Sequence, residues 1–202
     1  PEFVQHIKAT IKLFPDAIAI GCNANIEMRG QLQSRPSFLS AHNWEVIPAP
    51  GDLATRYFAR FQSGIAPFPG YVYQRCKVEA LRFNSSEGKY SDVTWLLRLT
   101  EKAPLVWICR SLMTYRIHGG NDGLVESRRD RLRFLAYLKR HREQFSQALI
   151  DDYRCSFLYK PLKKNQRQAS LKRRDLALRF LRRHAWQRYV RLDTYKTVIK
   201  HA

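Results

Sequence analysis

Two stretches of this sequence gather ionisable side chains, GKYSDVTWLLRL at 88–99 and SLMTYRIHGGNDG at 111–123. Asp92 begins a predicted helix, where the helix dipole favours an ionised carboxylate. Such a carboxylate suits either a helix cap or a general base that removes a proton from a hydroxyl group. His118 precedes a Gly-Gly turn, so its imidazole suits either a surface position or a contact with a divalent cation or a phosphate oxygen. Arg116 suits either a surface ion pair or the neutralisation of a phosphate.

The elements that must position these residues alternate between helices and strands. Helical spacing of Phe3, Ile7, Ile11 and Phe14 predicts a helix over 2–14, and the apolar run at 17–28 predicts a buried strand directly after it. This succession is typical of an α/β unit. Three further helices are predicted, at 51–61, 92–102 and 124–145, with helical turns at 77–81. Short strands are predicted at 71–73, 105–109 and 112–117. Between them we expect a loop at 29–50, a polar loop at 84–92 in which Ser91 caps the next helix, and a turn at 119–122.

The same periodicity predicts which side chains form the core. In the predicted helices the expected inner positions are Leu53, Tyr57, Phe61, Val93, Leu96, Leu97, Thr100, Leu132, Leu135, Leu138 and Phe145. Trp95 and Trp107 are expected in the core rather than as platforms for sugars. Cys22, Cys76, Cys109 and Cys155 form no metal-ligand spacing, so we expect buried, reduced thiols.

Together the two stretches resemble the second half of the family 2, A-type nucleotide-sugar glycosyltransferases, over roughly residues 1–145. In that family an acidic residue opens a helix below the active site, an arginine lies further along the helix, and a YRxH turn faces the metal and the diphosphate. The matching residues are Asp92, Arg98, Tyr115, Arg116 and His118. The resemblance implies that Asp92 is the general base, that Arg116 binds substrate, and that His118 ligates Mn2+ or Mg2+ or contacts a phosphate. For Arg98 two roles stay open: it binds substrate or, the favoured alternative, it orients Asp92 or packs the helix.

Two other parts of the chain extend this resemblance. PGYVYQR (69–75) looks like the family's segment beside the sugar pocket, which implies that Gly70 and Tyr71 bind substrate. The first 26 residues resemble the family's segment directly after its Asp-x-Asp metal motif, and residues 1–30 hold no such acidic pair. The implied fold is therefore α/β, the C-terminal half of an A-type transferase fold with a basic helical extension. We expect the chain to be inactive without the nucleotide-binding half.

The positive charge is concentrated near the C-terminus. Lys and Arg number 36 against 17 Asp and Glu, a formal net charge of +19, and 14 of these cations lie in residues 160–200. We therefore expect a catalytic part at 1–148 and a basic helical extension at 149–202. Residues 160–200 suit peripheral contact with anionic lipid, a solvated helical hairpin packed on the catalytic part, or nucleic acid. Nucleic acid is the least favoured partner, because no recognised motif for it occurs.

These expectations converge on a transferase. It would move a sugar from a nucleotide-diphosphate sugar to a saccharide or lipid-linked acceptor, with inversion and metal assistance, in cell-surface polysaccharide synthesis. Its expected location is the cytoplasm or the cytoplasmic face of the membrane. Two other interpretations stay open: a non-catalytic basic module that binds anionic membrane or nucleic acid, and an inactive glycosyltransferase-like scaffold.

Overall fold

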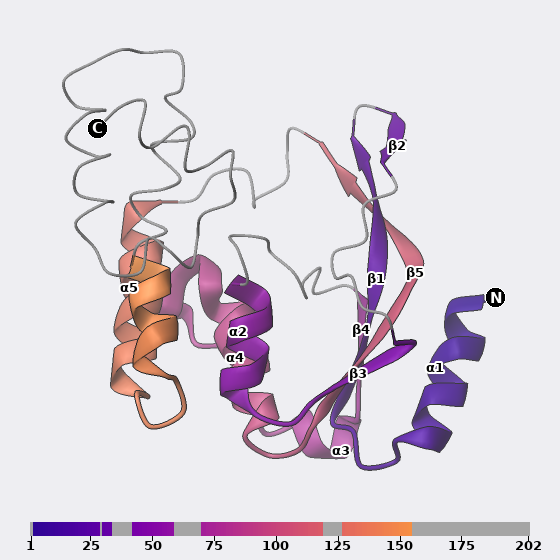
Figure 1. The fold of residues 1–202 in the computed structure, drawn as a ribbon, viewed down its shortest axis with the longest axis horizontal. Helices are drawn as coiled ribbons and strands as arrows, with labels where there is room; N and C mark the ends of the chain where they lie inside the picture. Colours follow the sequence, from indigo (N-terminus) through magenta and orange to yellow (C-terminus); the bar gives the residue numbers. More distant parts are fainter. Residues whose placement is uncertain (1, 29, 34–41, 59–69, 119–126, 155–202) are drawn as a thin grey trace. The chain divides into compact units, whose positions relative to one another are not determined.

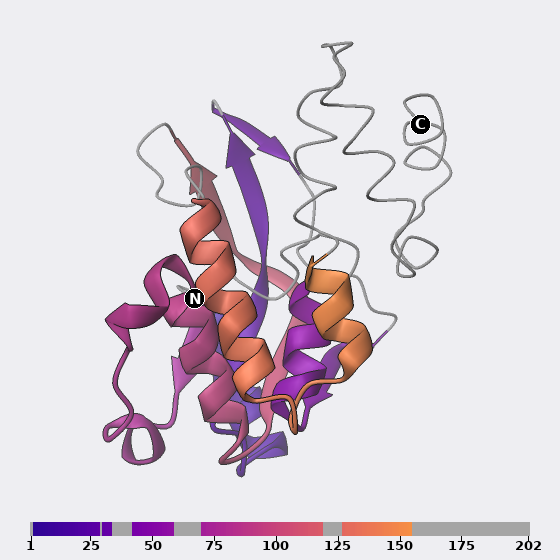
Figure 2. The ribbon, with the colours of Figure 1, turned by 90° about the vertical axis from the view of Figure 1, so that its left-hand side faces the viewer.

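A computed structural model of the chain describes residues 2–28, 30–33, 42–58, 70–118 and 127–154 (Figure 1). The chain divides into two compact units, Pro1–Tyr137 and Leu138–Ala202. The first unit holds a mixed sheet and most of the helices, as Figures 1 and 2 show from two sides. The expected α/β class is therefore confirmed. The basic segment 160–200, the turn at 119–122 and Cys155 lie outside the described residues.

The sheet has five strands. They are β1 (Ala19–Met28), β2 (Gln31–Gln33), β3 (Trp44–Ile47), β4 (Tyr71–Tyr73) and β5 (Leu105–Ile117). Their order is β2-β1-β5-β3, and β4 also pairs with β1. The long central strands β1 and β5 are parallel, and the other pairs are antiparallel. The prediction of a loop over 29–50 is wrong where β2 and β3 lie, because three or four residues are too few for alternation to reveal a strand.

Strand β5 is continuous, whereas the sequence predicted two strands separated at Arg110 and Ser111. The pairing with β1 passes from Cys22↔Ile108 to Asn23↔Ser111 and then to Ala24↔Met113, so three residues of β5 bulge out of register. The buried Asn23 fills this bulge. Its Nδ2 donates to the Cys109 carbonyl oxygen over 2.6 Å, and its Oδ1 accepts from Trp107 Nε1 over 3.1 Å. The side-chain amide of Asn23 therefore forms hydrogen bonds with both the bulged backbone at Cys109 and the buried indole of Trp107.

The helices are α1 (Glu2–Leu13), α2 (Pro50–Phe58), α3 (Arg75–Val78), α4 (Ser91–Thr100) and α5 (Arg128–Arg140), with a 3-10 helix η3 (Ser85–Tyr90) before α4. The expected inner positions of α4 are all buried, and so are Trp95 and Trp107. Of the remaining expected core positions, Leu53, Leu135, Leu138 and Phe145 are buried, and the side chains of Tyr57 and Phe61 lie outside the described part. The amphipathic pattern thus identified most of the inner positions. The predicted helix over 124–145 is too long, because α5 ends at Arg140 and the buried Phe145 lies beyond it in a bend.

Two burial predictions are wrong, since Leu132 is 47% exposed and Cys76 is exposed, and Cys109 is only partly buried. Ile11, which shares the helical spacing of α1, is 47% exposed. In α1 the inward position falls to Thr10, whose hydroxyl donates to the His6 carbonyl oxygen and accepts from Trp44 Nε1. A threonine whose hydroxyl is satisfied in this way can replace an apolar residue at the interface, which rotates Ile11 outwards.

Gly21 lets two aromatic rings pack over the sheet. A Cβ at this position would lie 2.5 Å from ring carbons of both Tyr71 and Trp107. These rings are buried, with centroids 5.5 Å apart, so neither has room to withdraw. The glycine is therefore required by packing.

We expect Gly21→Ala to lower the free energy of unfolding by about 1–3 kcal/mol, the usual effect of overpacking a dense core. Urea denaturation followed by circular dichroism measures this loss. Gly70→Ala is the matched control, since its nearest neighbour is the flexible Met113 Sδ at 3.0 Å. A loss at Gly21 no larger than that at Gly70 would contradict the packing argument.

Candidate functional site

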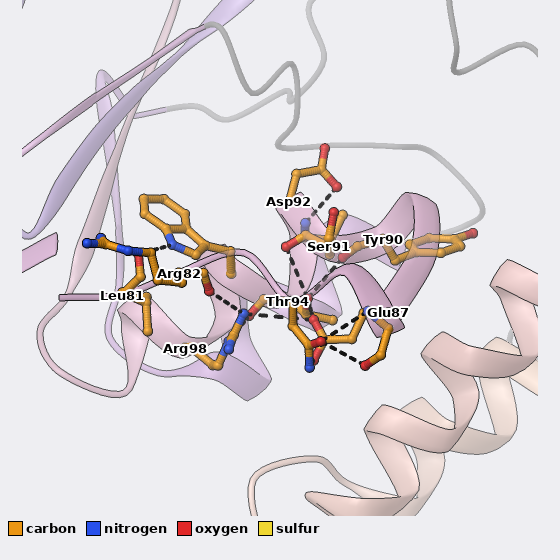
Figure 3. Close-up of polar contacts among 12 residues, drawn as sticks. Leu81, Arg82, Glu87, Tyr90, Ser91, Asp92, Thr94 and Arg98 are labelled. Carbon is orange, nitrogen blue, oxygen red and sulfur yellow. Dashed lines mark hydrogen bonds and ion pairs between the residues drawn. The ribbon is translucent and has the colours of Figure 1, made fainter. Parts of the chain in front are cut away.

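Asp92 lies in the first turn of α4. Its Oδ1 accepts a hydrogen bond from the Val93 backbone N–H over 2.8 Å. Figure 3 shows the carboxylate pointing away from the polar side chains of Thr94 and Arg98. The prediction that Ser91 caps this helix is wrong, because Ser91 is its first residue and Tyr90 holds the cap position without a side-chain bond.

Burial makes the Asp92 carboxyl more basic than an ordinary aspartate. Desolvation raises its pKa, and the hydrogen bonds from the N–H groups of Val93 and Asp92 itself offset this only in part. The pKa of Tyr73 is raised too, first by burial and then by the negative charge of Asp92. Burial thus disfavours the charged form of Asp92, and Tyr73 keeps its phenolic proton. A carboxylate in these surroundings is suited to accept a proton near neutral pH.

Aromatic side chains of β4 and α4 pack together around Tyr73. Tyr73 meets the Trp95 ring edge to face, with centroids 5.0 Å apart and an interplanar angle of 82°. Tyr71 stacks on Tyr73 at 6.0 Å and touches Trp107 on its other side. Tyr71 is thus buried in the core beside the site, and its predicted contact with substrate stays a prediction.

Gly70 allows β4 to begin close to β1. A Cβ here would lie 3.0 Å from Met113 Sδ and 3.4 Å from the Cys22 carbonyl oxygen. The absence of a side chain therefore serves the approach of two strands. The predicted approach of a sugar to Gly70 stays a prediction.

A polar cluster on the other side of α4 holds the helix against the preceding segment. Glu87 accepts hydrogen bonds from Thr94 Oγ1 and from Asn84 Nδ2, the latter over 3.1 Å, and pairs with Arg98 at 3.8 Å. Arg98 also donates to the Arg82 carbonyl oxygen over 3.2 Å. Arg98 therefore positions the segment before α4 (Figure 3), and its predicted contact with substrate stays a prediction.

Sequence reasoning did not identify Glu87, although a signal was present. Asn84 accepts from the Ser86 backbone N–H, and its amide donates to Glu87 three residues later. This spacing of a cap residue and a glutamate is the capping-box pattern. It places the start of η3 inside what the sequence predicted as a polar loop.

A second clamp joins this segment to the start of α5. Asp130 accepts from Ser127 Oγ over 2.5 Å and from the Lys89 backbone N–H over 3.5 Å. These groups lower the pKa of Asp130, with the Ser127 bond as the first cause. The Tyr90 ring stacks on Phe134 with centroids 4.7 Å apart. The residues just before Asp92 are therefore fixed from both sides.

Arg116 and His118 lie at the far end of β5. Arg116 forms a bidentate ion pair with Glu27, with Nε 2.8 Å from Oε1 and Nη2 3.2 Å from Oε2. These bonds raise the pKa of Arg116. The pair follows from the parallel register Glu27↔Arg116. His118 is exposed directly after the strand. Sequence reasoning missed Glu27, because only the register brings it beside Arg116.

The structure places these residues apart from Asp92. Tyr73, which feels the charge of Asp92, pairs with Ala19 opposite Leu105 at the start of β5. Arg116 pairs with Glu27, eight residues farther along β1 than Ala19, which at roughly 3.3 Å per residue is a separation of about 26 Å. Within the described ranges, no three His, Cys, Asp or Glu side chains gather where they could hold a metal ion. The metal role of His118 stays a prediction.

Two further findings concern membranes and relatives. In the part of the chain that the structure describes, no helix has the length and apolar character needed to cross a membrane. Comparisons of the chain with protein-family models, curated proteins and solved structures gave no match.

Proposed function

We propose that this chain is part of a nucleotide-sugar glycosyltransferase in which Asp92 is the general base. The observation that carries the proposal is the half-buried Asp92 carboxyl, whose pKa is raised at the start of α4 beside Tyr73. The order of motifs in the sequence supports the same reaction, since Asp92, Arg116 and His118 match the family's pattern.

In the proposed reaction Asp92 accepts the proton of the acceptor hydroxyl while that oxygen attacks the anomeric carbon of the donor. The bond from this carbon to the diphosphate breaks, and the diphosphate departs with the electron pair. Attack opposite the leaving group inverts the anomeric centre. Tyr73 keeps its proton, and the burial of Asp92 sustains the basicity of its carboxylate.

The resemblance also assigns residues to the diphosphate of the donor. By the resemblance alone, Arg116 would neutralise the departing diphosphate, and His118 would contact it or bind Mn2+ or Mg2+. Both residues lie apart from Asp92 along β5, so the geometry of the described residues lends these two roles no support. The described residues alone do not supply a complete set of metal ligands. The acceptor would be a saccharide or a lipid-linked molecule, with residues 160–200 in peripheral contact with the cytoplasmic membrane face and nucleic acid the least favoured partner.

The test is sugar transfer by the natural gene product that contains these 202 residues. Purified protein is incubated with UDP-, GDP- and dTDP-sugars and with Mn2+ or Mg2+, and the released nucleoside diphosphate is measured against pH. We expect turnover of one donor, with an acid limb above the ordinary aspartate range near pH 4, because the raised pKa of Asp92 leaves it protonated at higher pH. Turnover of no donor, or a rate unchanged down to pH 4, would refute the proposal.

A further inference from the structure

Helix α5 has a strongly basic outer face. Its thirteen residues include six Lys or Arg and a single acid, Asp130. Asp130 is buried, where it clamps the preceding segment to the helix, so its charge is not on the surface. The exposed cations are Arg128 and Arg129 in the first turn and Lys139 and Arg140 in the last. Within α5, the outer face therefore carries four cations and no acid.

The centre of this outer face is apolar. Leu132 is 47% exposed, and Ala136, one turn later, is exposed as well. The repeat of 3.6 residues places a pair of cations on either side of these two residues, Arg128 with Lys139 and Arg129 with Arg140. At 1.5 Å per residue each pair spans roughly 16 Å along the helix. The face is thus a short apolar stripe with positive charge along both edges.

The apolar stripe is not needed to hold the helix in the fold. The opposite face of α5 supplies its core contacts, through the buried side chains of Phe134, Leu135, Tyr137 and Leu138. Leu132 points away from them, which is why the prediction of its burial fails. A single exposed leucine is ordinary on a protein surface, but one bordered only by cations has a charge pattern that suits an anionic partner.

We propose that the outer face of α5 lies on the surface of a bilayer that contains anionic phospholipid. Leu132 would enter the boundary between headgroups and acyl chains, and the flanking cations would bind lipid phosphates. The aliphatic part of an arginine can follow the leucine while its guanidinium group stays at the phosphates. Because α5 already packs on the core, binding does not require the helix to form.

The composition of this face favours lipid over two other partners. Nucleic acid would use the cations but leave Leu132 in contact with water, and the outer face of α5 has no aromatic ring on which a base could stack. A protein interface has a broader apolar centre than one leucine and one alanine. A bilayer uses both features, since it offers phosphates beside an apolar layer.

Cosedimentation of the natural gene product with phosphatidylcholine vesicles that contain about one third phosphatidylglycerol tests the contact. We expect Arg128→Gln combined with Arg129→Gln to weaken the apparent Kd for these vesicles by about tenfold or more, because each cation near anionic lipid strengthens binding by roughly fivefold. Leu132→Gln should weaken it by about fivefold, and this loss should persist at raised salt, since it comes from apolar burial.

The matched control is Lys8→Gln combined with Lys12→Gln. It also removes two exposed cations, but from α1. We expect the Kd to stay within about twofold of wild type, because α1 is not part of the proposed contact and charges more than about 10 Å from the membrane are screened at 0.1 M salt. All variants keep residues 160–200, so lipid binding by that segment is common to every comparison.

The inference goes beyond the proposed function, which places membrane contact only in residues 160–200, and its test does not require sugar transfer. An effect of the α5 arginine pair no larger than that of the α1 lysine pair would overturn it, as would no binding of the wild type to these vesicles. A loss in the arginine pair with Leu132→Gln unchanged would overturn it too, since that result indicates a soluble polyanion such as nucleic acid. Circular dichroism establishes that each variant is folded.

Discussion

Replacement of Asp92 by Asn is expected to lower the rate of sugar transfer by about 100-fold or more, the scale of losing a general base. Asparagine has nearly the same shape as aspartate and can still accept the Val93 N–H bond, but it cannot take a proton. The measurement is the initial rate of nucleoside diphosphate release at saturating donor and acceptor. A variant that retains the wild-type rate would show that Asp92 is only a residue of the first helical turn.

The matched control is Asp52→Asn. Asp52 is also an acidic residue in the first turn of a helix, α2, where it pairs with Arg56 at 3.9 Å. We expect its replacement to leave the transfer rate within about twofold, since surface pairs of this kind contribute little. An equal loss in both variants would point to a general effect of charge rather than to catalysis by Asp92.

The free energy of unfolding of Asp92→Asn distinguishes a loss of catalysis from a loss of folding. Burial raises the folded-state pKa, so the folded protein binds this proton more tightly than the unfolded chain. The ionised carboxylate therefore opposes folding, and stability falls as pH rises from the unfolded-state pKa through the folded one. Asp92→Asn should thus unfold at a higher urea concentration than wild type at neutral pH, a difference that disappears in acid. Lower stability at neutral pH would contradict this account.

Gly88→Ala is expected to lower the free energy of unfolding by about 2–4 kcal/mol. Gly88 adopts φ 64° and ψ −138°, a conformation that side chains strongly disfavour. A Cβ would also clash with Asp130 Oδ1 and lie 2.9 Å from a guanidinium nitrogen of Arg133. Backbone strain and steric conflict therefore act together, and the conflict falls on the carboxylate that clamps η3 to α5. Urea denaturation measures the loss.

Gly30→Ala separates the two causes. Gly30 also has a positive φ, of 76°, but a Cβ there would meet nothing within 4 Å, so only backbone strain of about 1 kcal/mol is expected. Gly88→Ala combined with Asp130→Ala should cost less than the sum of the two single changes, since the conflicting carboxylate is gone. Equal losses of unfolding free energy at Gly88 and Gly30 would show that the Asp130 carboxylate does not constrain Gly88.

Local pattern in the sequence determined much of this fold. The stripe Val93, Leu96, Leu97 and Thr100 identified the buried face of α4, because a helix repeats every 3.6 residues whatever surrounds it. The apolar run before Met28 identified β1, and the acidic residue at the start of α4 marked Asp92 as a candidate base. Each of these features depends on neighbours along the chain, so sequence spacing is sufficient to reveal it.

Tertiary structure decided what depends on distant residues. The bulge in β5 is stabilised by Asn23, more than eighty residues away, so Arg110 and Ser111 alone suggested a break where the strand continues. Glu27 meets Arg116 only through the parallel register.

The electrostatics of the site likewise came from packing. The raised pKa of Asp92 arises from burial, and its charge in turn raises the pKa of Tyr73 on a separate strand. The ring of Phe83 stacks on Trp95 of the following helix, and Arg98 of that helix bonds to the carbonyl oxygen of the preceding residue, Arg82. Sequence spacing specifies which residue types are near one another along a helix or strand. The desolvation and contacts that change their chemistry exist only once separate elements have packed together.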